Sequence, residues 1–172
     1  ISWPGRIKDV GGIRSQFAHV IDIVPTILEA SGIPAPDVVD GIKQAPIEGT
    51  SLAYTFDAAN ADAPTRHITQ YFEMMGDHAI YHEGWLLSTK VIRAPWEAFG
   101  PANPDPLNNV TWELYNLNED YSQTNDLAAQ NPEKVEELKK VFLAEAQKYN
   151  VLPLDASVAA RIVAPRPNIT AG

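Results

Sequence analysis

The chain of 172 residues contains no cysteine. This excludes disulfide bridges, thiolate zinc sites, iron–sulfur clusters and a cysteine nucleophile, although it leaves the cellular compartment open, because a protein without cysteine folds in either redox environment. Long apolar runs are also missing: residues 17–28, the longest, contain His19, Asp22 and Pro25 and are too short and too polar to span a bilayer. The first residues show no basic region followed by an apolar one, so they do not resemble a signal peptide.

Positive charge is scarce, with 13 Lys and Arg against 22 Asp and Glu, which gives a formal net charge of -9 at pH 7. The acid excess repels phosphate backbones and anionic lipids, and no cluster of Lys or Arg interrupts it. We therefore predict that the chain binds neither nucleic acid nor membrane surfaces. The sequence also begins without methionine and ends in Asn-Ile-Thr-Ala-Gly, so we expect a fragment of a longer protein.

The first 66 residues predict one helix followed by a long connection. Asp22 is a candidate N-cap with Pro25 in the first turn, and Gly32 is a candidate C′ residue followed by Pro34. Residues 33–66 are rich in Pro, Asp and Ala with little periodicity, so we predict a surface connection there.

From residue 67 the pattern becomes that of β-structure. Aromatic and β-branched residues predict strands at His67–Glu73, Ala79–His82, Trp85–Arg93 and Thr111–Tyr115, with a tight turn at Glu83-Gly84. A proline-rich loop separates the last two strands. The sequence therefore predicts a small antiparallel sheet of about four strands.

A helix over residues 131–149 is the clearest element of the sequence. Asn131 is a candidate N-cap, Pro132 suits the first helical position, and apolar residues recur at helical spacing up to Tyr149. This apolar stripe must cover the sheet, which makes the fold class α+β. After Asn150 periodicity is lost, so we predict a linker over residues 151–172 towards a further domain that is missing from this chain.

Four histidines are the first place to look for a general base at neutral pH, because their ordinary pKa lies nearest to it. None has a recognisable catalytic context. His19 precedes a helix start in an apolar stretch, which is typical of a packing residue. His78 and His82 lie four positions apart on a strand, about 13 Å at a rise of about 3.3 Å per residue, too far for one metal ion.

Acidic residues gather at Glu113, Glu119, Asp120 and Asp126. Their spacing does not match the calcium loop of an EF-hand, and a solvated acidic turn explains them better. We therefore predict no catalytic residue and no metal site in this chain.

Residues 17–32, Phe-Ala-His-Val-Ile-Asp-Ile-Val-Pro-Thr-Ile-Leu-Glu-Ala-Ser-Gly, resemble a segment from the second half of the sulfatase family. Three further pieces resemble that family in the correct order: Ile1–Gly5 its core strand end, Tyr71–Trp85 its hairpin, and Trp112–Ala128 its last strand and turn. The resemblance covers about residues 1–152, and the bacterial arylsulfatases are the nearest subgroup. One departure is His78, where the hairpin usually has arginine.

The resemblance implies the C-terminal subdomain of an α/β, alkaline-phosphatase-like fold. Residues 1–32 would belong to the large domain, 33–66 to a surface connection, 67–150 to the sheet subdomain and 151–172 to a linker. The implied parent hydrolyses sulfate esters to an alcohol or phenol and sulfate, using formylglycine and calcium. The residues that hold both lie upstream in the family, so the missing partner of this chain is the N-terminal catalytic domain. A periplasmic or extracytoplasmic parent is compatible with this.

Ser2-Trp3-Pro4-Gly5-Arg6 also fits the short S-x-P-x-R form of the formylglycine signature. The Leu-Thr-Gly that follows the signature falls on Val10, Gly11 and Gly12, of which the last alone matches. We therefore expect residues 1–5 to be a strand end and turn, and Ser2 not to be the nucleophile.

The loop from Glu73 to His78 is the candidate substrate-facing element, because loops on rigid sheets often carry specificity. The alternative is that both residues form a hairpin pair or are merely solvated. For the whole chain, the alternatives are a stand-alone protein-binding or assembly module and half of a related phosphonate or phosphate ester hydrolase. A fragment would expose an apolar face and self-associate.

Overall fold

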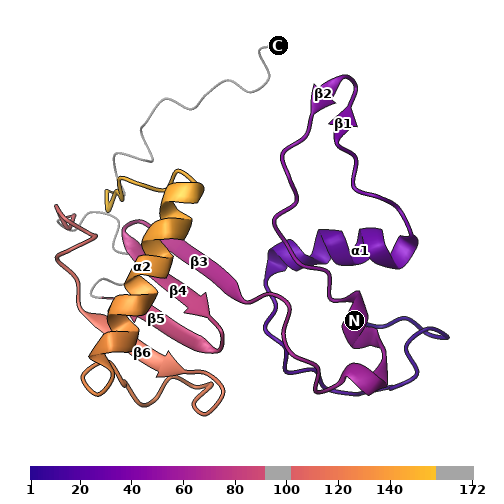
Figure 1. The fold of residues 1–172 in the computed structure, drawn as a ribbon, viewed down its shortest axis with the longest axis horizontal. Helices are drawn as coiled ribbons and strands as arrows, with labels where there is room; N and C mark the ends of the chain where they lie inside the picture. Colours follow the sequence, from indigo (N-terminus) through magenta and orange to yellow (C-terminus); the bar gives the residue numbers. More distant parts are fainter. Residues whose placement is uncertain (92–101, 158–172) are drawn as a thin grey trace. The chain divides into compact units, whose positions relative to one another are not determined.

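The computed structural model describes residues 1–91 and 102–157, and the chain divides after Ile68 into two units (Figure 1). Unit 1 is Ile1–Ile68 and unit 2 is Thr69–Gly172. No helix in the described ranges is both long and apolar enough to cross a membrane.

Unit 1 is built around helix α1 (Ile23–Ser31), which a short 3-10 turn, η1 (Val20–Asp22), precedes. The helix ends at Gly32 as predicted, because Gly32 adopts a φ of 67° and its N–H reaches back to Leu28 and Glu29. Asp22 occupies the N-cap position of α1 as predicted, but its side chain makes no capping hydrogen bond to this helix. The carboxylate is used elsewhere in unit 1.

The connection after α1 contains more structure than its sequence predicts. A short hairpin pairs β1 (Val38–Val39) with β2 (Ile42–Lys43) around Asp40 and Gly41, which both have positive φ. Two 3-10 turns follow, η2 (Ala53–Phe56) and η3 (Ala58–Asn60). Strands of two residues give no detectable alternation, which is why periodicity missed them.

Unit 2 contains the predicted four-stranded antiparallel sheet, in the order β3-β4-β5-β6. The strands are β3 (Thr69–Met74), β4 (Asp77–His82), β5 (Trp85–Thr89) and β6 (Trp112–Asn116). Each strand pairs with its neighbour in sequence. The predicted third strand extended to Arg93, which lies outside the described residues, and β5 ends earlier.

Two tight turns fix the register of the sheet. Glu83 and Gly84 have φ values of 49° and 86°, and Met75 and Gly76 have values of 55° and 90°. Positive φ at both central residues is characteristic of the type I′ turn, whose twist matches that of the flanking strands. The Glu83-Gly84 turn was predicted. The Met75-Gly76 turn was missed because the predicted loop extended to His78.

Helix α2 (Pro132–Lys148) lies across one face of the sheet, as its apolar stripe predicted (Figure 1). The core is formed by three strand residues and four helix residues: Ile80, Leu87, Leu114, Val135, Leu138, Phe142 and Ala146. Asn131 does not cap this helix through its side chain, whose Nδ2 donates to the Leu127 carbonyl instead. The position of α2 therefore depends on the packing of its apolar residues against the sheet and not on a side-chain cap at Asn131.

The segment after α2 folds back onto unit 2. The Val151 N–H donates to the Ala146 carbonyl, and Val151 and Leu154 pack against the core. Ala156 is buried. Residues 151–157 of the predicted linker thus lie against the sheet subdomain, and residues 158–172 lie outside the described part of the chain.

Candidate functional site

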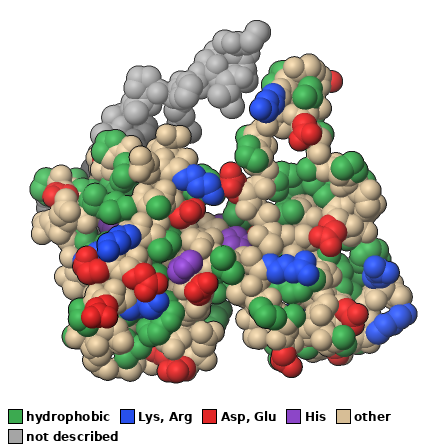
Figure 2. Space-filling view, in the orientation of Figure 1, with side chains coloured by type: hydrophobic (Ala, Val, Ile, Leu, Met, Phe, Trp, Pro, Cys, Tyr) green, Lys and Arg blue, Asp and Glu red, His purple; other side chains and the backbone are tan. Residues whose placement is uncertain are grey.

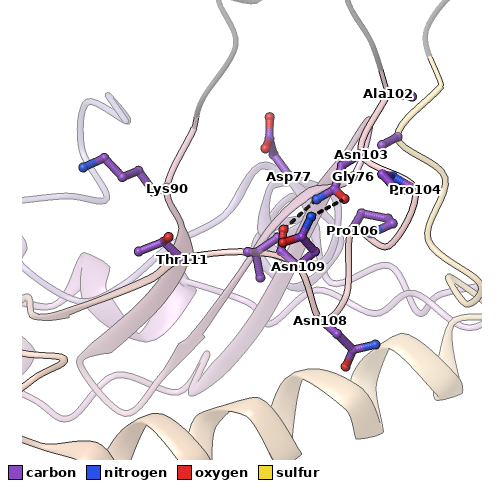
Figure 3. A pocket seen from close by; sticks show the side chains of 12 residues that line it. Gly76, Asp77, Lys90, Ala102, Asn103, Pro104, Pro106, Asn108, Asn109 and Thr111 are labelled. Atoms are coloured by element: carbon purple, nitrogen blue, oxygen red, sulfur yellow. Dashed lines mark hydrogen bonds between the residues drawn. The ribbon is translucent and has the colours of Figure 1, made fainter.

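A pocket of about 490 Å³ opens at the end of the β3–β4 hairpin (Figure 3). Its lining comes from the turn residues Gly76 and Asp77, from Lys90 after β5, from the loop 102–111 and from Ala156. Figure 3 shows Lys90 and Thr111 to one side of the turn. Four separate segments of unit 2 therefore converge on one hollow.

Gly76 allows this convergence. A β-carbon at this position would lie 2.7 Å from the Ala156 Cβ and 3.1 Å from the Pro106 Cβ. Both distances are shorter than ordinary carbon contacts, and the positive φ of Gly76 disfavours any side chain. The glycine therefore lets the loop and the C-terminal segment close around the turn.

The loop wall is held by hydrogen bonds between asparagines. Asn103 Nδ2 donates to the Asn109 carbonyl at 2.8 Å, and Asn109 Nδ2 approaches Asn103 Oδ1 at 3.4 Å (Figure 3). Asp105 accepts hydrogen bonds from the backbone and side chain of Asn108. These contacts order a loop that has no regular secondary structure.

Among the described residues that line the pocket, Lys90 and Asp77 carry charge, one of each sign. The Lys90 backbone N–H donates to the Thr111 carbonyl at 2.8 Å, which fixes where its side chain begins. Its Nζ lies 4.0 Å from Glu113 Oε1, and the Lys90 side chain is 60% exposed. Such a pair is weak, so the ammonium group stays available to a ligand.

The two residues predicted to face substrate, Glu73 and His78, lie at paired positions of β3 and β4. Glu73 Oε1 accepts the Gly76 N–H at 3.0 Å and so supports the turn from behind. His78 is 3% exposed, and its ring packs against Trp112 and Phe142 in the core. The hairpin tip does line the pocket, but through Gly76 and Asp77. A substrate-facing role of Glu73 stays a prediction. The burial of His78 in the core argues against such a role for His78.

The His78 ring is held in one tautomer when it is neutral. Its Nδ1 lies 2.8 Å from the Gly76 carbonyl, which only accepts, so this nitrogen carries the proton. The Nε2 atom is buried without a hydrogen-bond partner among the described residues. Burial lowers the pKa of His78 below 6.5, although the Gly76 carbonyl and the carboxylates of Asp77 and Glu73 oppose the change.

Unit 1 contains a second buried polar group that sequence reasoning missed, the pair Asp22 and His67. Asp22 is fully buried, and both of its carboxylate oxygens lie 2.8 Å from Nδ1 of His67, which is 6% exposed. The carboxylate also accepts the His19 N–H and the Thr50 N–H, each at 2.7 Å. The local signal in the sequence is the spacing of His19 and Asp22, three residues apart, which bond through the His19 N–H. This spacing does not reveal His67, which is 45 residues away from Asp22.

These bonds determine the ionisation of Asp22. Burial by itself raises the pKa of its carboxyl group, but the N–H groups of His19, Thr50 and His67 outweigh burial and hold the pKa below 3.8. Asp22 is therefore an anion, and it links the segments around His19, Thr50 and His67 by hydrogen bonds. The contacts of this pair are internal to unit 1, which makes it a structural anchor.

The predicted acidic turn after β6 uses its carboxylates internally. Asp120 accepts the N–H groups of Thr124 and Asn125 and the Thr124 hydroxyl, while Asp126 accepts the N–H groups of Leu114 and Ala128. These donors lower the pKa of Asp120. In residues 1–91 and 102–157, no three His, Cys, Asp or Glu side chains are placed to share a metal ion.

Ser2 lies on an apolar groove of about 480 Å³ beside α1, whose lining includes Trp3, Ile23, Ile27 and Phe56. A formylglycine and calcium centre needs carboxylates and cations around the sulfate group. The groove offers neither, so the surroundings of Ser2 do not fit that centre. Hydrophobic side chains also reach the surface over α1 (Figure 2).

No known family's sequence profile matches the chain. Its fold is similar to parts of solved sulfatase structures. One, from Bacteroides thetaiotaomicron, is named BT33336S-sulf in work on the metabolism of multiple glycosaminoglycans; it is 18% identical with a TM-score of 0.47, and the match covers 73% of this chain and 24% of that one. Another, BT4656 in complex with its substrate D-glucosamine-2-N,6-O-disulfate, is 18% identical with a TM-score of 0.46, and the match covers 77% of this chain and 24% of that one. A third, Ps i-CgsB, is 17% identical with a TM-score of 0.51, and the match covers 86% of this chain and 28% of that one.

The chain thus spans about a quarter of the length of these structures. At such low identity the likeness concerns the fold. It agrees with the predicted α+β architecture, in which a small antiparallel sheet and a C-terminal helix form the C-terminal subdomain of the sulfatase fold.

Proposed function

We propose that this chain is the C-terminal part of an arylsulfatase, which hydrolyses sulfate esters to an alcohol or phenol and sulfate. Two observations support the proposal. Four sequence segments resemble sulfatases in the correct order, and the sheet and helix expected from that resemblance are present in unit 2. The observation that carries most weight is the ordered pocket at the predicted hairpin tip.

The two units would contribute to the parent enzyme without performing its chemistry. Formylglycine would supply the nucleophile and calcium would stabilise the sulfate charge. Within residues 1–91 and 102–157, neither the groove at Ser2 nor any cluster of carboxylates fits these groups. The pocket would bind and orient the part of the ester next to the reacting sulfate, and holding a substrate in the correct geometry contributes to catalysis. The chain alone would therefore be inactive.

The proposal is tested by extending the coding sequence upstream and comparing the long protein with the 172-residue chain. We expect the long protein to hydrolyse 4-nitrophenyl sulfate in the presence of calcium, and the short chain to show no turnover. The Ser2→Ala variant of the long protein should keep its activity. Turnover by the short chain that is lost in Ser2→Ala would overturn the division of labour proposed here.

The same assay separates a related hydrolase. A long protein that prefers a 4-nitrophenyl phosphonate or phosphate ester over the sulfate would favour the phosphonate or phosphate hydrolase. The exposed apolar side chains of α1, which include Ile23, Val24 and Ile27, favour one further candidate, a protein-binding module. That candidate predicts no esterase activity in the long protein.

A further inference from the structure

We propose that His78 is an acid-sensitive latch, whose protonation releases residues 151–157, here called the strap, from the tip of the β3–β4 hairpin. The sheet and α2 stay folded in this step. Gly76 and Ala156, which meet at the latch, also line the pocket at the hairpin tip. A regulatory meaning for the parent enzyme therefore rests on the proposed function, whereas the latch itself is measured without any turnover.

The ring of His78 is bonded to the hairpin tip and enclosed by the core. Its Nδ1 donates to the Gly76 carbonyl at 2.8 Å. Its ring centroid lies 4.8 Å from that of Trp112 and 4.6 Å from that of Phe142. Because the hydrogen bond of the ring ends on the turn, the ring cannot move without moving Gly76 or losing that bond.

The other ring nitrogen is where an added proton binds. Nε2 is buried and has no hydrogen-bond partner among the described residues. A proton there would create a buried N–H group and a positive charge, which are costly to bury without a partner. The ring gains a water partner by moving out of its contacts with Trp112 and Phe142. Protonation therefore drives His78 out of the closed arrangement.

The charges around His78 oppose this effect of burial without cancelling it. The carboxylates of Asp77 and Glu73 favour the protonated ring, but burial outweighs them and lowers the pKa of His78 below 6.5. The closed arrangement is therefore favoured above pH 6.5 and loses its advantage as the pH falls below that value. Charged side chains lie on each of the elements around the ring: Glu73 of β3, Asp77 of β4, Lys90 after β5, Glu113 of β6, Lys139 of α2 and Asp155 of the strap.

Gly76 passes a movement of the ring on to the strap. A β-carbon on Gly76 would lie 2.7 Å from the Ala156 Cβ, so the backbone of the turn is in direct contact with Ala156. Ala156 is 7% exposed, whereas Leu152, Pro153 and Asp155 of the strap are exposed. The end of the strap is thus held by the packing of Ala156 on the turn.

The strap is held more weakly than the sheet. Its first residue, Val151, donates to the Ala146 carbonyl at 2.8 Å, and Asp155 accepts hydrogen bonds from Ser157 within the strap itself. The four strands, by contrast, are joined by three continuous ladders. Segments with few backbone bonds and few buried contacts open before the core does. We therefore expect the strap to open from its Ala156 end while the sheet remains intact.

The test is a pH titration of the isotope-labelled 172-residue chain by NMR, from about pH 7.5 to about pH 5. The imidazole carbon signals of His78 report its protonation, and the heteronuclear 1H–15N NOE of the Ala156 amide reports motion of the strap. We expect this NOE to fall with the same midpoint as the titration of His78, below pH 6.5. The NOE of Leu138 in α2 should stay constant, because the helix stays packed on the sheet.

Two histidine variants test whether the response belongs to His78. His78→Asn keeps a donor that can reach the Gly76 carbonyl but takes up no proton, so the NOE of Ala156 should stay high throughout the titration. His82→Asn is the matched control, since His82 also bonds through its Nδ1, to the Thr69 hydroxyl. This control should keep the fall of the NOE.

A strap variant gives an independent measurement. If protonated His78 releases the strap, a released strap must favour protonated His78 by the same factor. Ala156→Gln places a bulky, uncharged side chain against Gly76, so it should free the strap at neutral pH and raise the pKa of His78. Protonation should become roughly 5- to 50-fold more favourable. Ser157→Gln, at the next and less buried position, should leave the pKa unchanged.

Three results would overturn the latch: an Ala156 NOE that stays high while His78 titrates, an equal fall of this NOE in His78→Asn, or an unchanged pKa of His78 in Ala156→Gln. If His78→Asn fails to fold, the Ala156→Gln measurement still decides the question. None of these results bears on ester hydrolysis by the long protein. Failure of the latch and failure of the proposed function are therefore distinguishable.

Discussion

Asp22 shows how one buried carboxylate can organise a unit that has few buried apolar side chains. It accepts hydrogen bonds from His19, Thr50 and His67, which come from three different parts of unit 1. A buried anion is stable when its lone pairs are satisfied in this way, and removing its charge leaves donors without a suitable partner.

The Asp22→Asn variant should therefore unfold unit 1 more easily. We expect a loss of about 2 to 4 kcal/mol in the free energy of unfolding, because the amide nitrogen faces other donors. Because the pKa of Asp22 is lowered in the folded state, its contribution is present above pH 3.8 and lost as the pH falls further. Urea titrations followed by amide NMR signals of unit 1 measure both effects.

Asp62→Asn is the matched control, since Asp62 is exposed and should change stability by less than about 0.5 kcal/mol. Equal stability of the two variants would mean that the three hydrogen bonds to Asp22 contribute little.

His78 makes unit 2 sensitive to mild acid. Because burial lowers its pKa below 6.5 in the folded state, the unfolded state binds a proton first as the pH falls. The stability of unit 2 should be full above about pH 6.5 and decline below it, by at most about 1.4 kcal/mol per pH unit for this one group.

The measurement is the urea midpoint of unit 2, followed by tryptophan fluorescence, at a series of pH values. His78→Leu should flatten the decline, because the leucine does not titrate. His82→Leu keeps His78 and should retain the decline. A decline that persists unchanged in His78→Leu would assign the sensitivity to another group.

At the scale of elements, α2 and the sheet stabilise each other through a narrow set of side chains. Leu138 is fully buried against the sheet, whereas Leu143 of the same helix is 39% exposed. Leu138→Ala should lower the free energy of unfolding of unit 2 by about 2 to 5 kcal/mol, through lost burial and the cavity left behind. Urea denaturation checks this.

Leu143→Ala makes the same chemical change outside the core and should cost about 1 kcal/mol or less. Similar losses in the two variants would show that burial of Leu138 against the sheet contributes no more to stability than the partly exposed Leu143 does.

These elements also show what the sequence could predict. Helix α2 and the Glu83-Gly84 turn were predicted because a regular apolar stripe and a turn glycine are local signals. The Met75-Gly76 turn was missed because the predicted loop extended to His78. The Asp22–His67 pair and the walls of the pocket were missed because each brings together residues distant in sequence. The predicted loop from Glu73 to His78 includes two residues that line the pocket, Gly76 and Asp77, while the strand register buries His78. A role of this loop in facing substrate stays a prediction.

At the scale of the molecule, the two units differ in how many apolar side chains they bury. The main apolar core belongs to unit 2, while unit 1 leaves apolar side chains of α1 exposed, with Ile23 and Val24 at 52% and Ile27 at 58%. On unit 2 acidic and basic side chains are interspersed (Figure 2). An exposed apolar helix face favours association.

We therefore expect the 172-residue chain to self-associate as its concentration rises. Ile27→Asp should shift it towards the monomer, because a charge opposes burial of the α1 face. Ile42→Asp introduces the same change at another exposed isoleucine, in β2, and should leave the association unchanged. Sedimentation velocity distinguishes the species, and a monomer at every concentration would contradict the expectation.

The bonds of Asp22 finally impose an order on how the chain matures during synthesis. Its partners Thr50 and His67 follow it by 28 and 45 residues, so translation must deliver His67 before unit 1 can close. In unit 2, by contrast, every strand meets a partner made just before it, which favours rapid folding. The last anchor of unit 1 would thus be synthesised only just before β3 begins. A nascent chain halted before residue 67 would lack the Asp22–His67 hydrogen bond, so unit 1 would stay open with its apolar side chains exposed.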